Sequence, residues 1–451
     1  MSSIKKLAIR GTIWTIASYG SSQILRFGSN LILTRLLAPD VFGLMALVYV
    51  FITGLHLFSD IGIGTSIVQN KRGDDPDFLN TAWTMQVVRG FGLWLCCLAI
   101  TWPVATLYGK TDFEKTELLW LIPIVGLNTV IDGFRSTSLF TLSRQIAVSK
   151  LAIFELGGQI VSLTVMIVLA WFYHNVWALV IGSAVSAVIQ LVWSHLLIPG
   201  LRNRFTWEQA AAKSIFSFGK WIFVSTALTF LSEQADRLIL GKLISFADLG
   251  VYGIAFALSD IPRQILMALS SKVLFPTFSK FADLPREDFR SKILQNRKPF
   301  LIAATLGLTA LACFGDMLIP VLYPPKYANA AWMLPLLAVG FWPRILTQTI
   351  DQALFAIGKS RYPAYGSFFK FLYMVIGLPL GFHYLKLPGA IIVIALNDLP
   401  FYGAIVYGLW REGLSSVRQD LKATALFIVL LTVMLIGRNM LGYGFPLDTM
   451  F

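Results

Sequence analysis

Charged side chains are scarce in this sequence of 451 residues. Asp, Glu, Lys and Arg together make up 14%, and hydrophobic residues make up 56%, whereas about a quarter of a soluble domain is charged. A soluble protein of this length could not cover its surface with so few charges. The deficit excludes a soluble globular protein and predicts an all-α integral membrane protein, because lipid then replaces water around most of the chain.

Cysteine, histidine and recognisable catalytic motifs are also lacking. Three cysteines lie within apolar runs, and the four histidines lack metal-ligand spacing. The sequence contains no G-x-S-x-G, Walker or H-E-x-x-H motif. We therefore expect no metal site, no cofactor and no catalytic residue. The net charge of +13 lies in short segments between apolar runs, so we also expect no nucleic-acid partner.

Twelve apolar runs are long enough to cross the hydrocarbon of a bilayer, which takes about 20 helical residues. They cover residues 11–33, 41–68, 79–107, 118–141, 148–173, 176–198, 215–243, 248–275, 298–323, 330–357, 362–385 and 388–410. A further run over 419–437 favours a thirteenth helix. The choice between twelve and thirteen, and with it the side of the C-terminus, stays open at this point.

Basic residues alternate along the chain in a way that sets orientation. One set of connections holds Lys5, Lys6 and Arg10, Lys71 and Arg72, and a cluster over 276–298 of Lys280, Arg286, Arg290, Lys292, Arg297 and Lys298. The opposite set holds only Arg35, Lys110, Lys115, Lys242, Lys326 and Lys386. The positive-inside rule then predicts a cytoplasmic N-terminus. It places the longest connections, 199–214 and 276–297, on the same side.

The two halves of the chain look like copies of one another. Residues 30–44 (NLILTRLLAPDVFGL) match 237–251 (RLILGKLISFADLGV) at an offset of 207, which also aligns Trp14 with Trp221. This predicts two six-helix lobes, 1–200 and 215–411, a linker at 201–214, and an additional helix and tail at 412–451. Six is an even number, so the lobes would be related by a pseudo-two-fold axis along the membrane normal, as in two-lobed transporters.

Several charges lie within the apolar runs, where each costs about 2.5–3.5 kcal/mol on insertion scales. Their spacing predicts internal ion pairs for Asp132–Arg135, Glu233–Arg237 and Asp260–Arg263. No partner lies near Arg26 or Arg344 in the sequence, which favours a wet, anion-binding cavity, because a guanidinium binds phosphate in a bidentate manner. Three further residues near cytoplasmic helix ends are expected to extend to the interface: Arg89, Glu155 and Lys370.

Four segments resemble one family in order along the chain. They are residues 11–14 (GTIW), 33–44 (LTRLLAPDVFGL), 58–69 (FSDIGIG, then IVQ) and 273–278 (VLFPTF). The chain resembles the polysaccharide transporter family, the Wzx-type oligosaccharide flippases of the multidrug/oligosaccharidyl-lipid/polysaccharide exporter superfamily, over about residues 5–410. That family usually has twelve or fourteen helices, so a thirteenth would be a departure.

The resemblance implies a flippase that moves an undecaprenyl-pyrophosphate-linked oligosaccharide across the bacterial inner membrane by alternating access, for surface polysaccharide export. It implies lipid-linked oligosaccharide and membrane lipids as partners, with polysaccharide polymerase and export machinery. Candidate residues for the anionic substrate are Arg26, Arg135, Arg237, Arg263 and Arg344. Candidates for ion coupling or internal ion pairs are Asp132, Glu233, Asp236, Asp260 and Asp398. The coupling ion, H⁺ or Na⁺, stays open.

Two other functions compete with this interpretation. A small-molecule or multidrug antiporter has the same fold, although arginines in its cavity would repel cationic drugs. A membrane polysaccharide polymerase or glycosyltransferase would generally need a sizeable external loop with catalytic side chains, which this sequence lacks.

Overall fold

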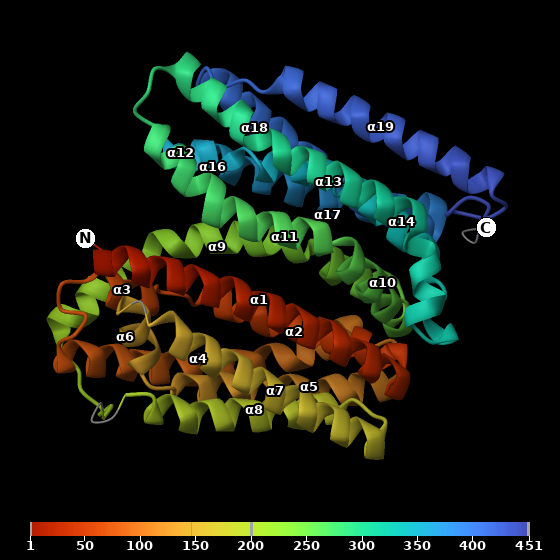
Figure 1. Ribbon diagram of the computed structural model, residues 1–451. Coiled ribbons are helices and arrows are strands. Elements are labelled where there is room, and N and C mark those ends of the chain that lie inside the picture. Colours follow the sequence, from red (N-terminus) through yellow and green to blue (C-terminus); the bar gives the residue numbers. More distant parts are fainter. Residues whose placement is uncertain (1, 146, 199–201, 449–451) are drawn as a thin grey trace. The chain divides into compact units, whose positions relative to one another are not determined.

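The computed structural model describes residues 2–145, 147–198 and 202–448, and every regular element there is helical (Figure 1). Side chains are described except at 1–13, 15–16, 146, 148, 199–201, 217–225, 272 and 449–451. Those of Lys5, Lys6, Arg10 and Trp221, used above for topology and repeat, therefore lie outside the described part. Within it, nine helices are long and apolar enough to cross a membrane. The prediction of an all-α multi-pass membrane protein is confirmed.

The chain forms two compact units, Met1–Ala227 and Leu228–Phe451, and the boundary falls inside one long helix, α9 (Gln209–Leu243). The helices of the first unit before α9 are α1 (Ser2–Leu36), α2 (Pro39–Phe58), α3 (Ile63–Gln69), α4 (Pro76–Tyr108), α5 (Asp112–Gly133), α6 (Ser138–Arg144), α7 (Val148–Tyr173) and α8 (Trp177–Leu196). In this unit α4 packs along α5, and α7 packs along both α1 and α8.

The second unit continues from α9 through shorter and more broken helices. They are α10 (Phe246–Ser259), α11 (Ile261–Leu269), the π-helix η1 (Ser270–Leu274), α12 (Phe275–Phe281), α13 (Arg286–Leu322), the 3₁₀ turn η2 (Pro325–Tyr327), α14 (Ala330–Gly340), α15 (Trp342–Gln348), α16 (Asp351–Ala356), α17 (Arg361–Ala395), α18 (Leu399–Arg411) and α19 (Val417–Met440). The thirteenth helix, predicted over 419–437, is confirmed as α19.

Five of the predicted spans are interrupted rather than continuous. The runs 41–68, 118–141, 248–275, 330–357 and 388–410 break near residues 59–62, 134–137, 260, 341–350 and 396–398. Gly62 adopts a left-handed conformation with φ of 65°, which turns the chain between α2 and α3. Prolines in the first turns of α11, α15 and α18 lack the N–H that would continue the preceding helix. Hydropathy averaged over a run does not detect such breaks.

The connection predicted over 276–297 is mostly helical. α12 continues to Phe281 and α13 begins at Arg286, which leaves only four residues between them. Arg297, assigned to that loop from its basic neighbours, is fully buried in α13. A buried arginine needs a partner from elsewhere in the fold, and the helix that provides one is α19.

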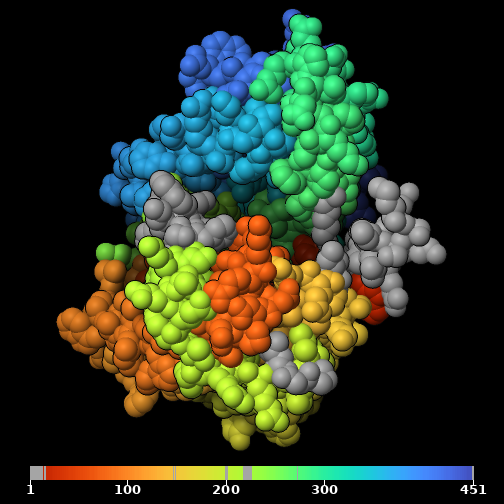
Figure 2. Space-filling model, turned by 90° about the vertical axis from the view of Figure 1, so that its left-hand side faces the viewer, coloured from red at the N-terminus to blue at the C-terminus, as the bar shows by residue number. Residues whose placement is uncertain are grey.

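Residues 202–208, which precede α9, form an extended segment along the first unit that we call the strap. Its backbone N–H groups at alternate residues Arg204, Thr206 and Glu208 donate to side chains of α4, at Asn80 (3.0 Å), Thr84 (3.1 Å) and Thr81 (3.1 Å) respectively. Figure 2 shows this end of the unit, where the orange loop around residue 72 lies beside the yellow-green strap. Side chains of α4 thus accept the hydrogen bonds of the strap's backbone N–H groups, as the carbonyls of a neighbouring strand would in a sheet.

Candidate functional site

The first unit contains a pocket where its broken helices meet. The pocket has a volume of about 410 Å³ and lies where α2 gives way to α3 and α5 to α6, with α4 beside them. Its polar and charged lining comprises His56, Asp60, Thr65, Gln86, Arg89, Thr129, Asp132, Arg135 and Ser136. A pocket of this volume can hold many water molecules, since a single water molecule needs only about 10–15 Å³ of such space.

Arg89 of α4 holds the broken end of α2. Its Nε donates to Ser59 Oγ at 2.9 Å and its Nη2 donates to the carbonyl oxygen of His56 at 2.8 Å. A cation at a helix C-terminus satisfies carbonyls that the helix leaves unbonded and complements its dipole. Arg89 is therefore half-buried against α2, whereas the sequence predicted that it extends to the interface.

The predicted Asp132–Arg135 ion pair is confirmed in this pocket. Asp132 Oδ1 lies 2.7 Å from Arg135 Nη2, and Arg135 lies two residues beyond Gly133, where α5 ends. Gln86 of α4 donates its Nε2 to the carbonyls of Asp132, Gly133 and Arg135 at 3.1–3.2 Å. The pocket thus combines two arginines with two carboxylates, and α4 supports both broken helix ends.

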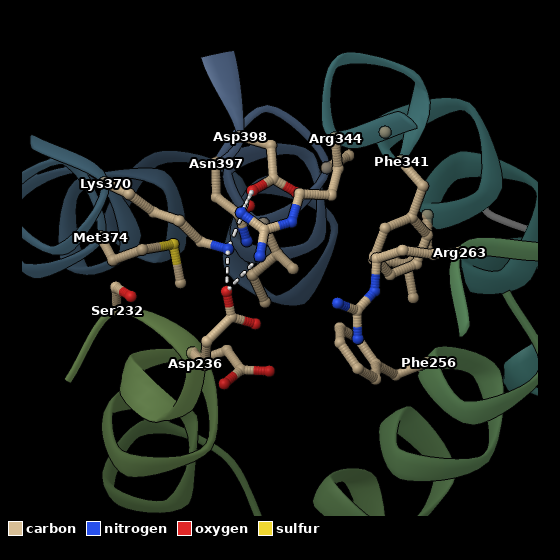
Figure 3. Close-up of a pocket in the computed structure, with 15 residues that line it drawn as sticks. Ser232, Asp236, Phe256, Arg263, Phe341, Arg344, Lys370, Met374, Asn397 and Asp398 are labelled. Carbon is tan, nitrogen blue, oxygen red and sulfur yellow. Dashed lines mark hydrogen bonds and ion pairs between the residues drawn. The ribbon is translucent and has the colours of Figure 1, made fainter. Parts of the chain in front are cut away.

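The second unit contains a smaller and more densely charged pocket (Figure 3). Its cavity is only about 20 Å³, which is room for a single water molecule. Charged side chains reach it from α9, α11, α15, α17 and the start of α18: Glu233, Asp236, Arg263, Arg344, Lys370 and Asp398. Helix breaks again surround the charges, at Phe341 and at Asp398.

Lys370 and Arg344 share the same two carboxylates. Lys370 Nζ lies 2.9 Å from Asp398 Oδ1 and 3.4 Å from Glu233 Oε1. Arg344 Nη2 lies 3.1 Å from Glu233 Oε1 and Nη1 lies 3.9 Å from Asp398 Oδ1, with the guanidinium 4.6 Å from the ring centre of Phe401. The prediction that Lys370 extends to the interface is wrong, because it is 5% exposed and both its acids come from other helices.

The predicted Glu233–Arg237 pair is wrong, since Glu233 pairs with Arg344 and Lys370 instead. Arg237 donates to Gln234 Oε1 at 2.7 Å and lies 5.2 Å from the ring centre of Phe256. Residues one helical turn apart can pair, but the stronger field of two cations on α15 and α17 draws the Glu233 carboxylate away from its own helix.

The Asp260–Arg263 pair is confirmed at the break between α10 and α11. The side chain of Arg263 lines the pocket, and Asp260, which is not part of the lining, pairs with it. Asp236 is 5% exposed, and its Oδ2 accepts a hydrogen bond from Tyr252. Its Oδ1 has no hydrogen-bond partner among the described residues. A buried carboxylate oxygen without a partner is costly and marks the side of the cavity where a ligand would be stabilised.

The candidate residues are thus divided between two pockets. Asp132 and Arg135 line the first, and Glu233, Asp236, Arg263, Arg344 and Asp398 line the second, with Asp260 bound to Arg263. Arg237 and Arg26 line neither, and Arg26 is exposed on α1. Sequence reasoning missed Arg89 and Lys370 as pocket residues. Their position inside apolar runs was the available signal.

Comparison with known proteins identifies the family. A family model described as "Polysaccharide biosynthesis protein" matches residues 32–331. The chain belongs to this family. It is 22% identical to the lipopolysaccharide biosynthesis protein WzxC of Escherichia coli (strain K12), over 95% of this chain and 89% of that protein. It is 24% identical to the succinoglycan biosynthesis transport protein ExoT of Rhizobium meliloti (strain 1021), over 74% of this chain and 66% of that one.

Two solved structures show the same fold. The lipid II flippase MurJ, in an inward closed conformation, matches with a TM-score of 0.71 and 13% identity, over 95% of this chain and 99% of that one. An inward-facing multidrug resistance MATE transporter matches with a TM-score of 0.68 and 13% identity, over 87% and 94%. These matches show the fold, and the family match over residues 32–331 confirms the resemblance predicted from the sequence segments.

Proposed function

We propose that this protein is a flippase that carries a lipid-linked oligosaccharide, of the undecaprenyl-pyrophosphate type, across the bacterial inner membrane by alternating access. The observation that carries the proposal is family membership, with similarity over nearly the whole chain to a protein named for lipopolysaccharide biosynthesis. The likeness to a lipid II flippase supports it, because that protein has the same fold. Surface polysaccharide export is the process the substrate would serve.

The first pocket is the better place for the charged head group. Its volume of about 410 Å³ and its two arginines, Arg89 and Arg135, suit a pyrophosphate with attached sugar, since guanidinium groups bind phosphate oxygens strongly. The second pocket, with a cavity of only about 20 Å³, is too small for a sugar. Arg26, exposed on α1, remains a candidate for the same anion.

Coupling to an ion gradient belongs to the second pocket in this proposal. Asp236 and Asp398 are buried there, and a buried acid changes its interactions whenever its surroundings change between two states. We propose a cytoplasmic N-terminus, which the distribution of lysine and arginine along the sequence supports. We also propose that the two halves are symmetry-related lobes, which the sequence repeat at an offset of 207 supports, and that the partners are the polysaccharide polymerase and export machinery.

The test is transport by purified protein in liposomes. Leaflet exchange of a fluorescent undecaprenyl-pyrophosphate oligosaccharide is measured for wild type, Arg26→Ala, Arg135→Gln and Arg418→Ala, the last an exposed control on α19. We expect exchange by wild type and the control, and a loss of at least about tenfold for Arg135→Gln, which corresponds to 1.4 kcal/mol of lost phosphate binding.

Two results would redirect the proposal. Exchange by Arg135→Gln at the wild-type rate would remove that arginine from the head-group site but keep the flippase. No exchange by wild type with several lipid-linked glycans, together with drug resistance on expression, would favour the small-molecule antiporter.

A further inference from the structure

Lys370 is an unusual residue for the middle of the second unit. It is 5% exposed on α17, and its ammonium lies between Asp398 of the α18 N-terminus and Glu233 of α9. Figure 3 shows its nitrogen pointing toward the carboxylate of Asp398, with Arg344 on the same carboxylate. A buried lysine with two acidic partners is held there by charge, since burial of an unpaired ammonium would be prohibitive.

The charges around this ammonium balance without any free ion. The pocket lining has three carboxylates, Glu233, Asp236 and Asp398, and three cations, Arg263, Arg344 and Lys370. Outside the lining, Asp260 is paired to Arg263, and Arg237 lies over Phe256 on the adjoining helix α10. Lys370 is the compact point charge among these cations, whereas the guanidinium groups are planar and spread over several atoms.

We infer that Lys370 is a built-in cation that excludes free sodium from this carboxylate cluster and so determines the ion specificity of the pocket. Its ammonium stands where Glu233 and Asp398 would otherwise bind a monovalent metal ion. The remaining cavity, about 20 Å³, does not admit a hydrated ion beside it. This inference rests on the proposed function and deepens it. Of the two coupling ions left open above, H⁺ and Na⁺, it rules out Na⁺ at this site.

Removal of the lysine charge should turn the cluster into a sodium site. Glu233 Oε1 and Asp398 Oδ1 already converge on the point that Nζ occupies, at 3.4 and 2.9 Å. Asp236 Oδ1 has no partner in the described part of the chain, and the side chain of Asn397 lines the same cavity. Sodium binds through oxygen ligands, and backbone carbonyls at broken helices, such as the break at Asp398, coordinate it in many transporters.

The experiment measures ion binding without any transport substrate. Thermal unfolding of purified wild type, Lys370→Met and Lys359→Met is followed in sodium chloride and in choline chloride at equal ionic strength. Lys359 is a matched control, since it pairs with Glu412 outside the pocket. We expect no difference between salts for wild type and Lys359→Met. For Lys370→Met we expect a midpoint about 2–4 °C higher in sodium, because binding to the folded state stabilises it.

A sodium-specific rise in wild type would overturn the inference, and so would a folded Lys370→Met that does not respond to sodium. If Lys370→Met does not fold, Lys370→Gln gives the same test with a polar side chain. Direct binding of radioactive sodium to wild type tests the exclusion without any variant. Adding Asp236→Asn to the lysine variant should abolish the sodium response. Because none of these readouts requires a lipid-linked sugar, failure of the proposed flippase function would leave them interpretable.

Discussion

The guanidinium of Arg297 lies 2.5 Å from the carboxylate of Asp420, and the two side chains are 0% and 2% exposed within the second unit. Arg297 of α13 also donates to Thr349 Oγ1 at 2.7 Å and to the carbonyl of Leu346 at 2.6 Å. Asp420, in the first turn of α19, accepts from Tyr402 at 3.1 Å as well. The pair therefore joins the thirteenth helix to α13, α15 and α18.

Replacement of Arg297 by methionine should destabilise the second unit by about 3–5 kcal/mol, because it leaves Asp420 buried without its counter-charge. The expected result is a marked drop in the thermal unfolding midpoint of the purified protein. The double variant Arg297→Met/Asp420→Leu should recover much of that loss, since both charges are then gone. Arg418→Met, at the exposed second residue of the same helix, should change the stability by less than about 0.5 kcal/mol. An unchanged midpoint in Arg297→Met would show that the pair contributes nothing.

The other end of α19 is fixed in a similar way. Arg438 lies 2.5 Å from Asp316 of α13. Midway along α19, the ring of Phe427 stacks on that of Trp342 with centres 4.6 Å apart. These contacts make α19 an integral helix of its unit. Truncation before Val417 would leave Arg297 buried without its charge partner and Asp316 without Arg438, so we expect little folded protein on gel filtration after such a truncation.

Gly90 of α4 allows the closest backbone approach in the first pocket. A Cβ there would lie 2.6 Å from the carbonyl oxygen of Thr129 and 3.3 Å from Cα of Gly133, both on α5. Small residues at helix interfaces serve this purpose in membranes. Gly90→Ala should therefore cost about 1–3 kcal/mol by forcing α4 and α5 apart. Gly92→Ala is the control, because nothing lies within 4 Å of a Cβ at that exposed position. Equal unfolding midpoints for the two variants would contradict the close approach.

Much of this fold was predictable from the sequence because its signals are local. Thirteen apolar runs correspond to helical segments, and Asp132–Arg135 and Asp260–Arg263 pair at a separation of three residues. Glu233 was assigned the wrong partner because Arg344 and Lys370 follow it by 111 and 137 residues. A single sequence carries no record of such distant contacts. Arg297 was misplaced for the same reason, since Asp420 lies 123 residues further on.

The helix breaks show a second limit of prediction from a single sequence. Their prolines and glycine were visible in the sequence, yet each lies inside a run whose mean hydropathy resembles that of a continuous span. Only the tertiary structure shows that Arg89 caps one broken end while Gln86 caps another. The two pockets depend on these breaks, so the pockets could not be assembled from periodicity alone.

Arg72 forms an exposed charge cluster with Asp75 and with Glu208, the last residue of the strap, outside the spanning helices. It lies 2.6 Å from Asp75 and 2.7 Å from Glu208. Hydrogen bonds from Arg72 lower the pKa of the Asp75 carboxyl and of the Glu208 carboxyl from ordinary values of 3.8 and 4.5. A lowered pKa in the folded state means that the stabilisation is present above these ordinary values and is lost as the pH falls below them.

Wild type and Arg72→Gln should therefore differ in unfolding midpoint at neutral pH and converge as the pH falls below about 4. The difference should be small and should shrink in high salt, because exposed pairs are screened. Midpoints measured across the pH range, with Lys71→Gln as an exposed neighbouring control, test this. A difference that grows toward acid would contradict the assigned sign.

The strap at residues 202–208 should become accessible to protease when its bonds to α4 are removed. Thr81→Val and Thr84→Val each remove one acceptor for a strap N–H, at Glu208 and Thr206. Each hydrogen bond contributes about 0.5–1.5 kcal/mol, so the open population should rise about 2- to 10-fold per bond. Limited trypsin digestion, which cuts after Arg202 or Arg204, should proceed faster in the variants by that factor. Thr106→Val, whose hydroxyl bonds only within its own helix, is the control. Equal cleavage rates in all three would mean that the strap is held by Arg72 and Glu208 rather than by the threonines, and Arg72→Gln would then be the variant that releases it.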